Sequence, residues 1–313
     1  MASVTRLNNN PMFIVHYRKF FYILSGLIVA ASLGAMLVFG VKLGIDFKGG
    51  SIIEVEYAGN RPALEQIDAA LKPLEVSPSI RPTGDKGYIV RMRSITEVER
   101  AKVTELLRGG ATTEMAVKRF DSIGPVLGAE AARKSIVSIV LVIVAIVIFV
   151  AFAFRKVSEP VSSWKYGGIA ILALVHDVIV PAGVFAVLGH YLGYEVDTLF
   201  VTALLVILGF SVHDTIVVFD RVRERLGENK KEEFATIVGE SIASTFARSI
   251  NTSLTTFLAL VALFFVGSDA TRQFALVLMV GIIAGTYSSI FLASPLLVTV
   301  EQWEKRKKAQ KAE

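Results

Sequence analysis

The sequence predicts a polytopic α-helical membrane protein with six transmembrane helices and one small α+β domain outside the membrane. Three observations predict this class. Six apolar runs reach membrane length, 53% of the 313 residues are hydrophobic, and a soluble-looking segment separates the first two runs. A mean hydropathy of +0.57 is too apolar for a soluble globular chain. Cysteine is absent, which excludes disulfides and thiolate metal sites.

Basic residues set the orientation of the helices, because Lys and Arg collect in short cytoplasmic loops. The loop after the second run carries Arg155, Lys156 and Lys165, whereas the loop at 190–196 has no Lys or Arg. Both termini are therefore expected in the cytoplasm, with residues 1–40 forming the N-terminus and first helix and 301–313 a basic tail. The six runs lie near residues 20–40, 133–154, 165–189, 197–219, 249–267 and 274–299, so that 131–300 holds helices two to six.

The same orientation places residues 41–130 outside the membrane, and their pattern predicts a β-α-β-β-α-β order of ferredoxin-like type. Thr96 and Glu99 have the spacing of a capping box, with Gly109 and Gly110 ending that helix. The segment lacks histidine and shows no nucleophile–base pair, so we expect a binding surface rather than a catalytic one. The predicted strands include 51–57, 88–93 and 115–121, and the predicted helices are 62–72 and 96–107.

A cytoplasmic segment at 220–247 separates the fourth and fifth runs. Its apolar residues Phe234, Ile237, Val238 and Ile242 fall near one helical face. This pattern fits an amphipathic helix on the membrane surface, and it fits equally a connector helix packed on the base of the bundle.

Two acidic residues, each preceded by histidine, interrupt the apolar runs: Asp177 and Asp214. A carboxylate at the centre of an inserted helix costs about 2.5–3.5 kcal/mol on insertion scales. Such residues are rare, face the bundle interior and often mark ion or proton paths. We take them as the main candidates for function.

The fifth run carries a candidate cationic partner for Asp214. Arg248, Asn251, Thr252 and Thr255 follow each other at helical spacing, and this polar stripe should face the bundle interior or water. Asp214 opposite Arg248 would make a proton-responsive pair, since a nearby cation lowers a carboxyl pKa and desolvation raises it. A static buried ion pair, or Arg248 reaching to the cytoplasmic interface, are the alternatives.

Asp177 precedes Pro181 and is either a second relay site or a structural hydrogen-bond acceptor. His176 and His213 are expected to pack in the bundle, and the four widely spread histidines do not form a metal site. The sequence has no Walker loop and no phosphate-binding glycine motif. We therefore expect neither a cofactor nor nucleic-acid binding, with protons as the coupling ion. Gly281 and Gly285 form a GxxxG pair typical of helix contacts.

Four stretches carry a family resemblance: Gly44-Ile-Asp-Phe-Lys-Gly-Gly50, Gly124-Pro-Val-Leu-Gly128, the run from Gly209 to Glu224, and Arg248-Ser-Ile-Asn-Thr-Ser-Leu-Thr-Thr256. In this order they resemble the SecF family, the smaller membrane subunits of bacterial SecDF protein-export complexes. The resemblance implies a half-transporter fold of the RND superfamily that pairs with SecD. It also implies SecYEG, YajC and secreted polypeptide as partners in the bacterial cytoplasmic membrane.

The resemblance places the proton path on Asp214 and Arg248, and it makes His213 a departure, because the family has Asn there. Gly44, Asp46, Gly49 and Gly50 belong to a motif that we interpret as a joint between membrane and external domain, with Asp46 capping backbone amides. A ligand-binding role for Asp46 is the alternative.

The predicted function is a non-enzymatic, proton-coupled subunit that helps pull secreted polypeptides across the membrane. Two alternatives differ in class. A proton-driven exporter of small molecules or lipids would need a larger external domain than 41–130, and a translocon scaffold without proton coupling would not need the charge on Asp214.

Overall fold

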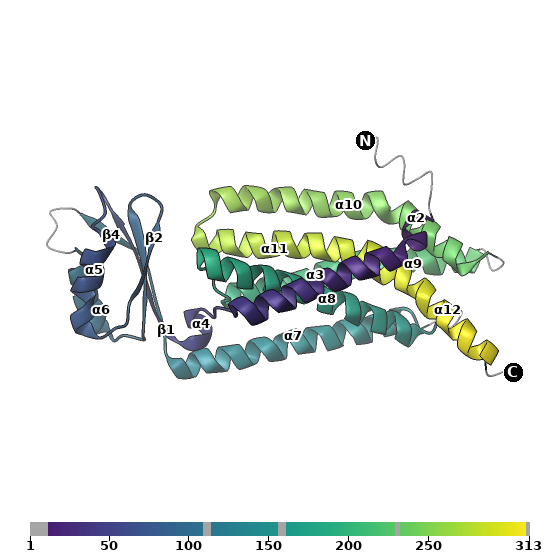
Figure 1. Ribbon diagram of the computed structural model, residues 1–313, viewed down its shortest axis with the longest axis horizontal. Helices are drawn as coiled ribbons and strands as arrows, with labels where there is room; N and C mark the ends of the chain where they lie inside the picture. The colour runs from purple at the N-terminus through teal and green to yellow at the C-terminus, as the bar shows by residue number, and fades with distance from the viewer. Residues whose placement is uncertain (1–11, 109–113, 156–160, 229–231, 311–313) are drawn as a thin grey trace. The chain divides into compact units, whose positions relative to one another are not determined.

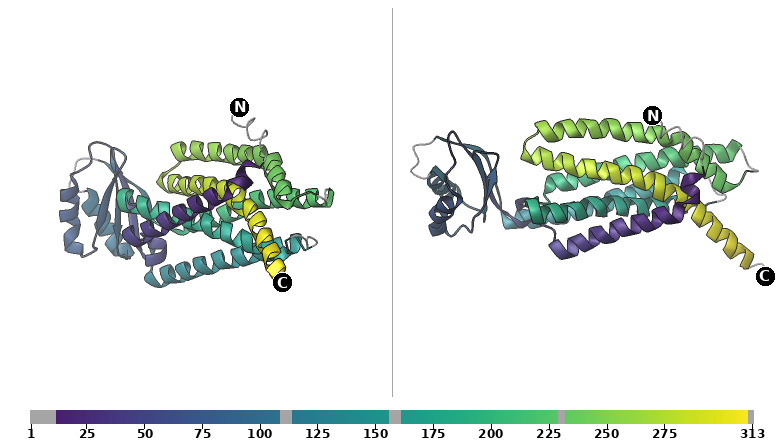
Figure 2. Two further views of the ribbon diagram at one scale, coloured as in Figure 1. Left: turned by 45° about the vertical axis from the view of Figure 1, so that its right-hand side comes forward. Right: turned by 45° about the horizontal axis from the view of Figure 1, so that its top comes forward.

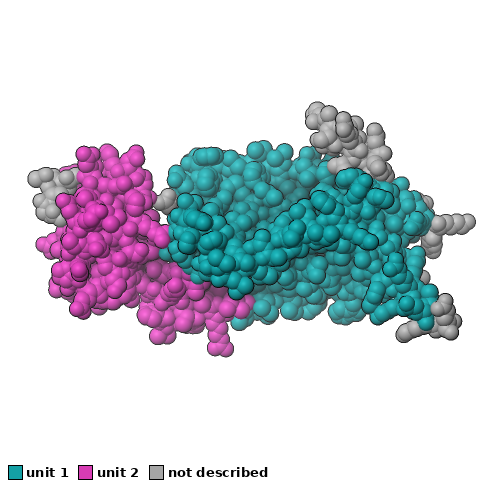
Figure 3. Space-filling model, in the orientation of Figure 1, with its two compact units in different colours: residues 1–42, 137–313 teal, residues 43–136 magenta. Residues whose placement is uncertain are grey.

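The computed structural model describes residues 12–108, 114–155, 161–228 and 232–310. The chain divides into two compact units, one of residues 1–42 and 137–313 and the other of residues 43–136 (Figure 3). The second unit nearly coincides with the predicted domain at 41–130. Each unit is described by itself below.

Six helices in the described part of the chain are long and apolar enough to cross a membrane, as the sequence predicts. Five of the spans are single helices, α3 (Arg18–Phe39), α7 (Pro125–Ala153), α8 (Ser163–Leu192), α9 (Thr198–Glu228) and α10 (Phe234–Val266), and the sixth is formed by α11 (Asp269–Tyr287) together with α12 (Ser294–Gln310) (Figure 1). A short helix, α2 (Phe13–His16), precedes α3. A π-helical turn, η2 (Ser288–Ala293), joins α11 to α12, so that the sixth span bends through a wider turn. Such turns occur often at functional sites.

The segment at 220–247 is not a separate surface helix. Its first residues end α9, and α10 begins at Phe234 and continues into the fifth span. Ile237, Val238 and Ile242 are at most 1% exposed and belong to a core that includes Val15 and Leu297. Their apolar face is covered by protein rather than lipid, which favours the packed connector.

Glycine sets the distance between α9 and α11. A Cβ atom at Gly281 would lie 2.1 Å from Ile207 Cδ1, and one at Gly285 would lie 2.9 Å from Ser211 Cβ. The GxxxG pair therefore packs within the chain, where it lets the two backbones approach closely. Figure 2 shows α11 beside α10 in both views.

The second unit is a four-stranded antiparallel sheet with two helices. Its order in the sheet is β2-β3-β1-β4, which is the ferredoxin-like arrangement that the sequence predicts. Fully buried side chains from the sheet and both helices form its core, among them Val55, Leu71, Val90, Val103 and Leu107. The elements are β1 (Gly50–Tyr57), α5 (Leu64–Leu71), η1 (Lys72–Leu74), β2 (Ser79–Thr83), β3 (Gly87–Met92), α6 (Glu97–Arg108) and β4 (Met115–Ile123).

The predicted capping box forms at the start of α6. The Glu99 amide donates to Thr96 Oγ1 at 3.3 Å, and the Thr96 amide donates to Glu99 Oε2 at 2.9 Å. Two amides that the helix leaves without partners are thereby satisfied. The predicted glycine end at 109–110 lies outside the described residues.

The two glycine motifs of the second unit pack against each other. Gly49 follows the short helix α4 (Ile45–Lys48) at φ +76°, and a Cβ there would lie 2.7 Å from Pro125 Cα. A Cβ at Gly128 would lie 2.7 Å from the Gly49 nitrogen. Only glycine fits both constraints at Gly49, because the left-handed conformation and the close backbone approach each exclude a side chain. Asp46 lies in the first turn of α4.

Candidate functional site

Asp214 lies in the middle of α9 with its side chain turned into the bundle, and the residue is 2% exposed. Ser253 on α10 donates a long hydrogen bond of 3.4 Å to Asp214 Oδ2. Ser253 Oγ also lies 2.6 Å from Thr286 Oγ1 on α11. The carboxylate therefore sits where three helices meet, next to hydroxyl groups.

Asp177 on α8 is fully buried and more completely hydrogen-bonded. Its Oδ2 accepts from Ser288 at 2.8 Å and from Ser211, and its Oδ1 lies 2.9 Å from His176 Nδ1. The expectation that both histidines pack in the bundle holds for His176, which is 3% exposed and also bonds its neighbouring aspartate, and fails for His213, which is exposed. Hydrogen bonding of this kind is how a protein tolerates a buried charge.

The two carboxylates belong to neighbouring parts of one polar layer. Ser289 donates to the Ser211 carbonyl at 3.2 Å, and its hydroxyl lies 2.8 Å from Thr215 Oγ1. Ser211, Asp214 and Thr215 occupy positions i, i+3 and i+4 of α9 and share one face. The π-helical turn η2 thus presents Ser288 to Asp177 on α8 and Ser289 to α9, the helix that carries Asp214.

Arg248 does not contact Asp214. Instead it lines a cavity of about 300 Å³ with Val217, Ser244, Thr245 and three charged residues of α9, namely Asp220, Arg221 and Glu224. Arg248 precedes Ser253 by five residues, which is about 7.5 Å along the helix axis and a different face. Among the described residues, Asp214 has no cationic partner in an ion pair, so the predicted contact is absent from this chain.

The polar stripe of α10 faces outward from the bundle. Arg248, Asn251 and Thr255 are exposed, Thr252 is half-buried, and the bundle is faced by Ser249 and Ser253 instead. Of the two expected orientations, bundle interior or water, the stripe has the outward one in this chain by itself. His213, one position before Asp214, is likewise exposed.

Comparisons with known proteins identify the fold. The family model described as "Protein export membrane protein SecD/SecF, C-terminal" matches residues 102–303, and the "SecD/SecF GG Motif" matches residues 34–59. The "Protein translocase subunit SecF" of Thermobaculum terrenum is 42% identical over 94% of both chains. The corresponding subunit of Anaerolinea thermophila is 39% identical, covering 94% of this chain and 95% of the relative.

The chain belongs to the SecF family. The family resemblance expected from the four sequence stretches is thus confirmed, and the chain is a Sec translocase subunit in protein export, a multi-pass transport protein rather than a catalyst. The crystal structure of SecDF, a translocon-associated membrane protein from Thermus thermophilus, superposes with a TM-score of 0.80 at 29% identity. The match covers 93% of this SecF-family chain and 38% of the SecDF chain, which implies SecD as the partner.

The residues that bond the two carboxylates were not among the sequence candidates. Ser211, Ser253, Thr286 and Ser288 hold Asp177 and Asp214 in place, whereas the candidate stripe on α10 does not. Two adjacent serines at 288–289 within an apolar span were an available signal. Small hydroxyl residues are common helix-packing residues in membranes, so this signal alone does not specify a carboxylate partner.

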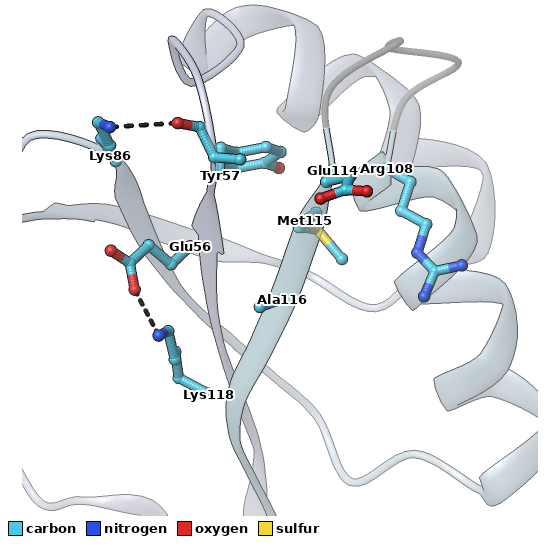
Figure 4. A pocket seen from close by; sticks show the side chains of 9 residues that line it. Glu56, Tyr57, Lys86, Arg108, Glu114, Met115, Ala116 and Lys118 are labelled. Carbon is cyan, nitrogen blue, oxygen red and sulfur yellow. Dashed lines mark hydrogen bonds and ion pairs between the residues drawn. The ribbon is translucent and has the colours of Figure 1, made fainter.

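The second unit has one charged hollow of about 610 Å³ at the ends of β1 and β4 (Figure 4). Lys118 forms an ion pair of 2.7 Å with Glu56, and this hydrogen bond lowers the pKa of the Glu56 carboxyl. The Lys86 ammonium donates to the Ala58 carbonyl at 3.1 Å. Arg108 and Glu114 add further charges of both signs to the lining, which also includes Tyr57, Met115 and Ala116. Such a lining fits a polar contact surface better than a site for chemistry.

Proposed function

We propose that this SecF-family chain couples proton flow to the export of secreted polypeptides, acting with SecD beside SecYEG, and YajC, in the bacterial cytoplasmic membrane with both termini inside. The observation that carries the proposal is the Asp214 carboxylate, 2% exposed inside a transmembrane bundle, with a hydroxyl donor and no cationic partner among the described residues. A carboxylate that the chain neither pairs with a cation nor exposes to water is costly unless it can take up a proton.

Arg248 enters this mechanism from outside the bundle of this chain. Its exposed side chain lies about 7.5 Å along α10 from the level of Ser253, and with Asn251 and Thr255 it offers SecD a polar surface. When Asp214 is charged it attracts Arg248 through a low-dielectric layer, and when it is protonated that attraction disappears. Proton binding therefore changes how α9 and α10 pack against SecD.

The external unit would receive this motion through the glycine motifs. Gly49 and Gly128 pack backbone against backbone, which ties α4 to the start of α7 without intervening side chains. Gly44, Asp46 and Gly50 belong to the same joint. Because the same helix, α7, continues into the second membrane span, movement of that helix would reach the external domain through these glycines.

The experiment is secretion in cells whose only copy of this chain carries Asp214→Asn, with its abundance and its co-purification with SecD measured in parallel. Asn keeps the size and the hydrogen bonds of a protonated Asp, so we expect an intact complex and loss of proton-dependent secretion. Glu228→Gln at the exposed end of α9 is the matched control, because it removes a carboxylate from the same helix outside the buried layer and outside the cavity that Arg248 lines. Normal secretion with Asp214→Asn at normal abundance would instead favour the alternative function, a translocon scaffold without proton coupling.

A further inference from the structure

The pair formed by His176 and Asp177 has no role in the mechanism above. Both side chains are buried, at 3% and 0% exposure, and His176 Nδ1 lies 2.9 Å from Asp177 Oδ1. The other imidazole nitrogen, His176 Nε2, is buried without a hydrogen-bond partner among the described residues. A buried, unpaired ring nitrogen is costly to leave in this state, so it calls for an explanation in function.

The hydrogen bonds around Asp177 are compatible with two protonation states. When the carboxylate is charged, Ser211 and Ser288 donate to Oδ2 and His176 Nδ1–H donates to Oδ1. The Ser288 hydroxyl has a second acceptor, the Gly285 carbonyl at 3.1 Å. When the carboxyl carries a proton, the Ser288 hydroxyl can turn to the Gly285 carbonyl, so that the Ser288 donor still has an acceptor. A purely structural acceptor would not need this alternative.

The position of the pair along the bundle places it next to Asp214. Ser211, which bonds Asp177, precedes Asp214 by three residues of α9, about 4.5 Å along the axis. Arg248 lies further in the same direction, toward the ends where α9 and α10 are joined. The three polar positions therefore follow one another along the bundle axis over about 12 Å.

The groups that could perturb the pair are few. On α9 the group is Asp214, and on α11 it is the phenol of Tyr287. The Tyr287 ring centroid lies 6.0 Å from that of His176, and the Tyr287 hydroxyl bonds Ser25 and the Phe21 carbonyl. The helix α3 packs on α8 and carries no Asp, Glu, Lys, Arg or His between Phe20 and Phe39; its one titratable side chain there is Tyr22, which bonds Thr299. No cation faces the pair from these described elements, so any positive charge must be a proton on His176 itself.

We propose that His176 and Asp177 form a second proton-binding site in the membrane layer, on the far side of Asp214 from Arg248. The role of this site in transport rests on the proposed function, but the proton chemistry of the pair does not. A proton arrives at His176 Nε2, the Nδ1 proton moves to Asp177 Oδ1, and the imidazole is left neutral with its hydrogen on Nε2. The pair gains one proton and its charge changes from −1 to 0, so charge and atoms balance.

The loaded state also has a structural consequence. With Asp177 protonated, Ser288 bonds Gly285 instead of the carboxyl, and the first residue of η2 loses its tie to α8 while Ser289 keeps its bond to α9. Because the layer excludes water, the charge of Asp177 also acts on Asp214. The occupancy of the two sites is therefore coupled.

The test is infrared spectroscopy of the purified complex with isotope-labelled aspartate, titrated from mildly acidic to mildly alkaline pH. We expect a protonated carboxyl band that changes with pH, disappears in Asp177→Asn, and remains in Asp214→Asn. In His176→Asn, which keeps a donor near the Nδ1 position but cannot bind a proton, the pH dependence of the band should shift. Absence of such a band, or a band that does not respond to pH, overturns the proposal.

Secretion measurements separate this proposal from the one it rests on. Asp177→Asn should lose proton-dependent secretion at normal abundance, whereas Ser294→Ala, a buried serine whose hydroxyl bonds the Ser289 carbonyl, should keep it. A purely structural role for Asp177 predicts full secretion with Asn, which preserves the hydrogen bonds, and would refute a role in transport. Failure of the Asp214→Asn prediction alone leaves the infrared assignment of Asp177 unaffected.

Discussion

Ser253 and Asp214 join α10 to α9 by a hydroxyl–carboxylate contact of 3.4 Å, and the same hydroxyl lies 2.6 Å from Thr286 on α11. Ser253 thus links the buried acid to the third helix, and the Thr286 hydroxyl itself also faces the carboxylate. The contact to the carboxylate is long, whereas the contact between the two hydroxyls is short. Asp214 is therefore held loosely compared with Asp177, which is bonded on both oxygens.

The packing of α9 on α11 gives the first prediction. Gly281→Ala places a methyl group 2.1 Å from Ile207, so the helices must separate or Ile207 must move. Overpacking of this kind costs about 1–3 kcal/mol. We expect a lower unfolding temperature of the purified chain, and partial recovery when Ile207→Ala is added.

Gly26→Ala on α3 is the matched control for this prediction, since a Cβ at Gly26 meets no described atom within 4 Å. The substitution removes a helix glycine as Gly281→Ala does, but it adds no overlap. Equal unfolding temperatures for the two variants would contradict the close α9–α11 contact.

The outward-facing stripe on α10 gives the second prediction, and the absence of native cysteine makes it simple to test. Cysteine introduced at Asn251 or Thr255 should react with a maleimide in the detergent-solubilised chain and should be protected when SecD is bound. Cysteine at Ser249, which is 1% exposed, should stay unreactive in both states. Equal reactivity of the Asn251 position with and without SecD would mean that the stripe faces lipid or water in the complex.

The glycine joint gives the third prediction. Gly49→Ala combines a left-handed backbone at φ +76° with an approach of 2.7 Å to Pro125, whereas Gly84→Ala has φ +52° and open space around it. A left-handed conformation costs an L-residue about 1–2 kcal/mol. We expect Gly84→Ala to show only this cost and Gly49→Ala to destabilise the second unit more, as measured by hydrogen exchange of β1 in the full chain. Similar exchange in the two variants would argue against a tight joint.

The sequence predicted the fold well because its signals are local. Apolar length identifies a span, alternation identifies the strands, and the pair of Thr96 and Glu99 marks the start of α6. The fifth helix was placed too late, at 249 instead of Phe234, because its first turns are amphipathic and resemble a surface segment. Their apolar side chains are covered by α2 and α12, which no local pattern specifies.

The site was predicted only in part. The buried positions of Asp177 and Asp214 follow from their apolar surroundings, and both are observed inside the bundle. The partner of Asp214 could not be derived, since helical spacing shows that Arg248 and Asn251 share a face but not which face meets α9. A polar stripe that contacts another chain and one that faces the bundle interior have the same periodicity in the sequence.

The fourth prediction concerns pH and the charge of Glu99. Hydrogen bonds from Arg93, at 2.6 Å, and from the Thr96 amide lower the pKa of the Glu99 carboxyl to about 2. Its value in an unfolded chain is about 4.3. Since the folded pKa is the lower one, the charged form stabilises α6 fully above about pH 4.3, and this stabilisation is lost as the pH falls toward 2.

Glu99→Gln isolates that charge, because glutamine can keep the capping hydrogen bonds and loses only the ionised group. In the full chain we expect faster hydrogen exchange across α6 in Glu99→Gln than in the wild type near neutral pH. After correction for intrinsic rates, the difference should shrink at pH values between the two pKa values. Glu97→Gln, in the same helical turn but paired only with Arg100 at 3.1 Å, is the control and should change exchange less. A difference between Glu99→Gln and wild type that persists unchanged into acid would show that shape, rather than the charge of the carboxylate, stabilises the start of α6.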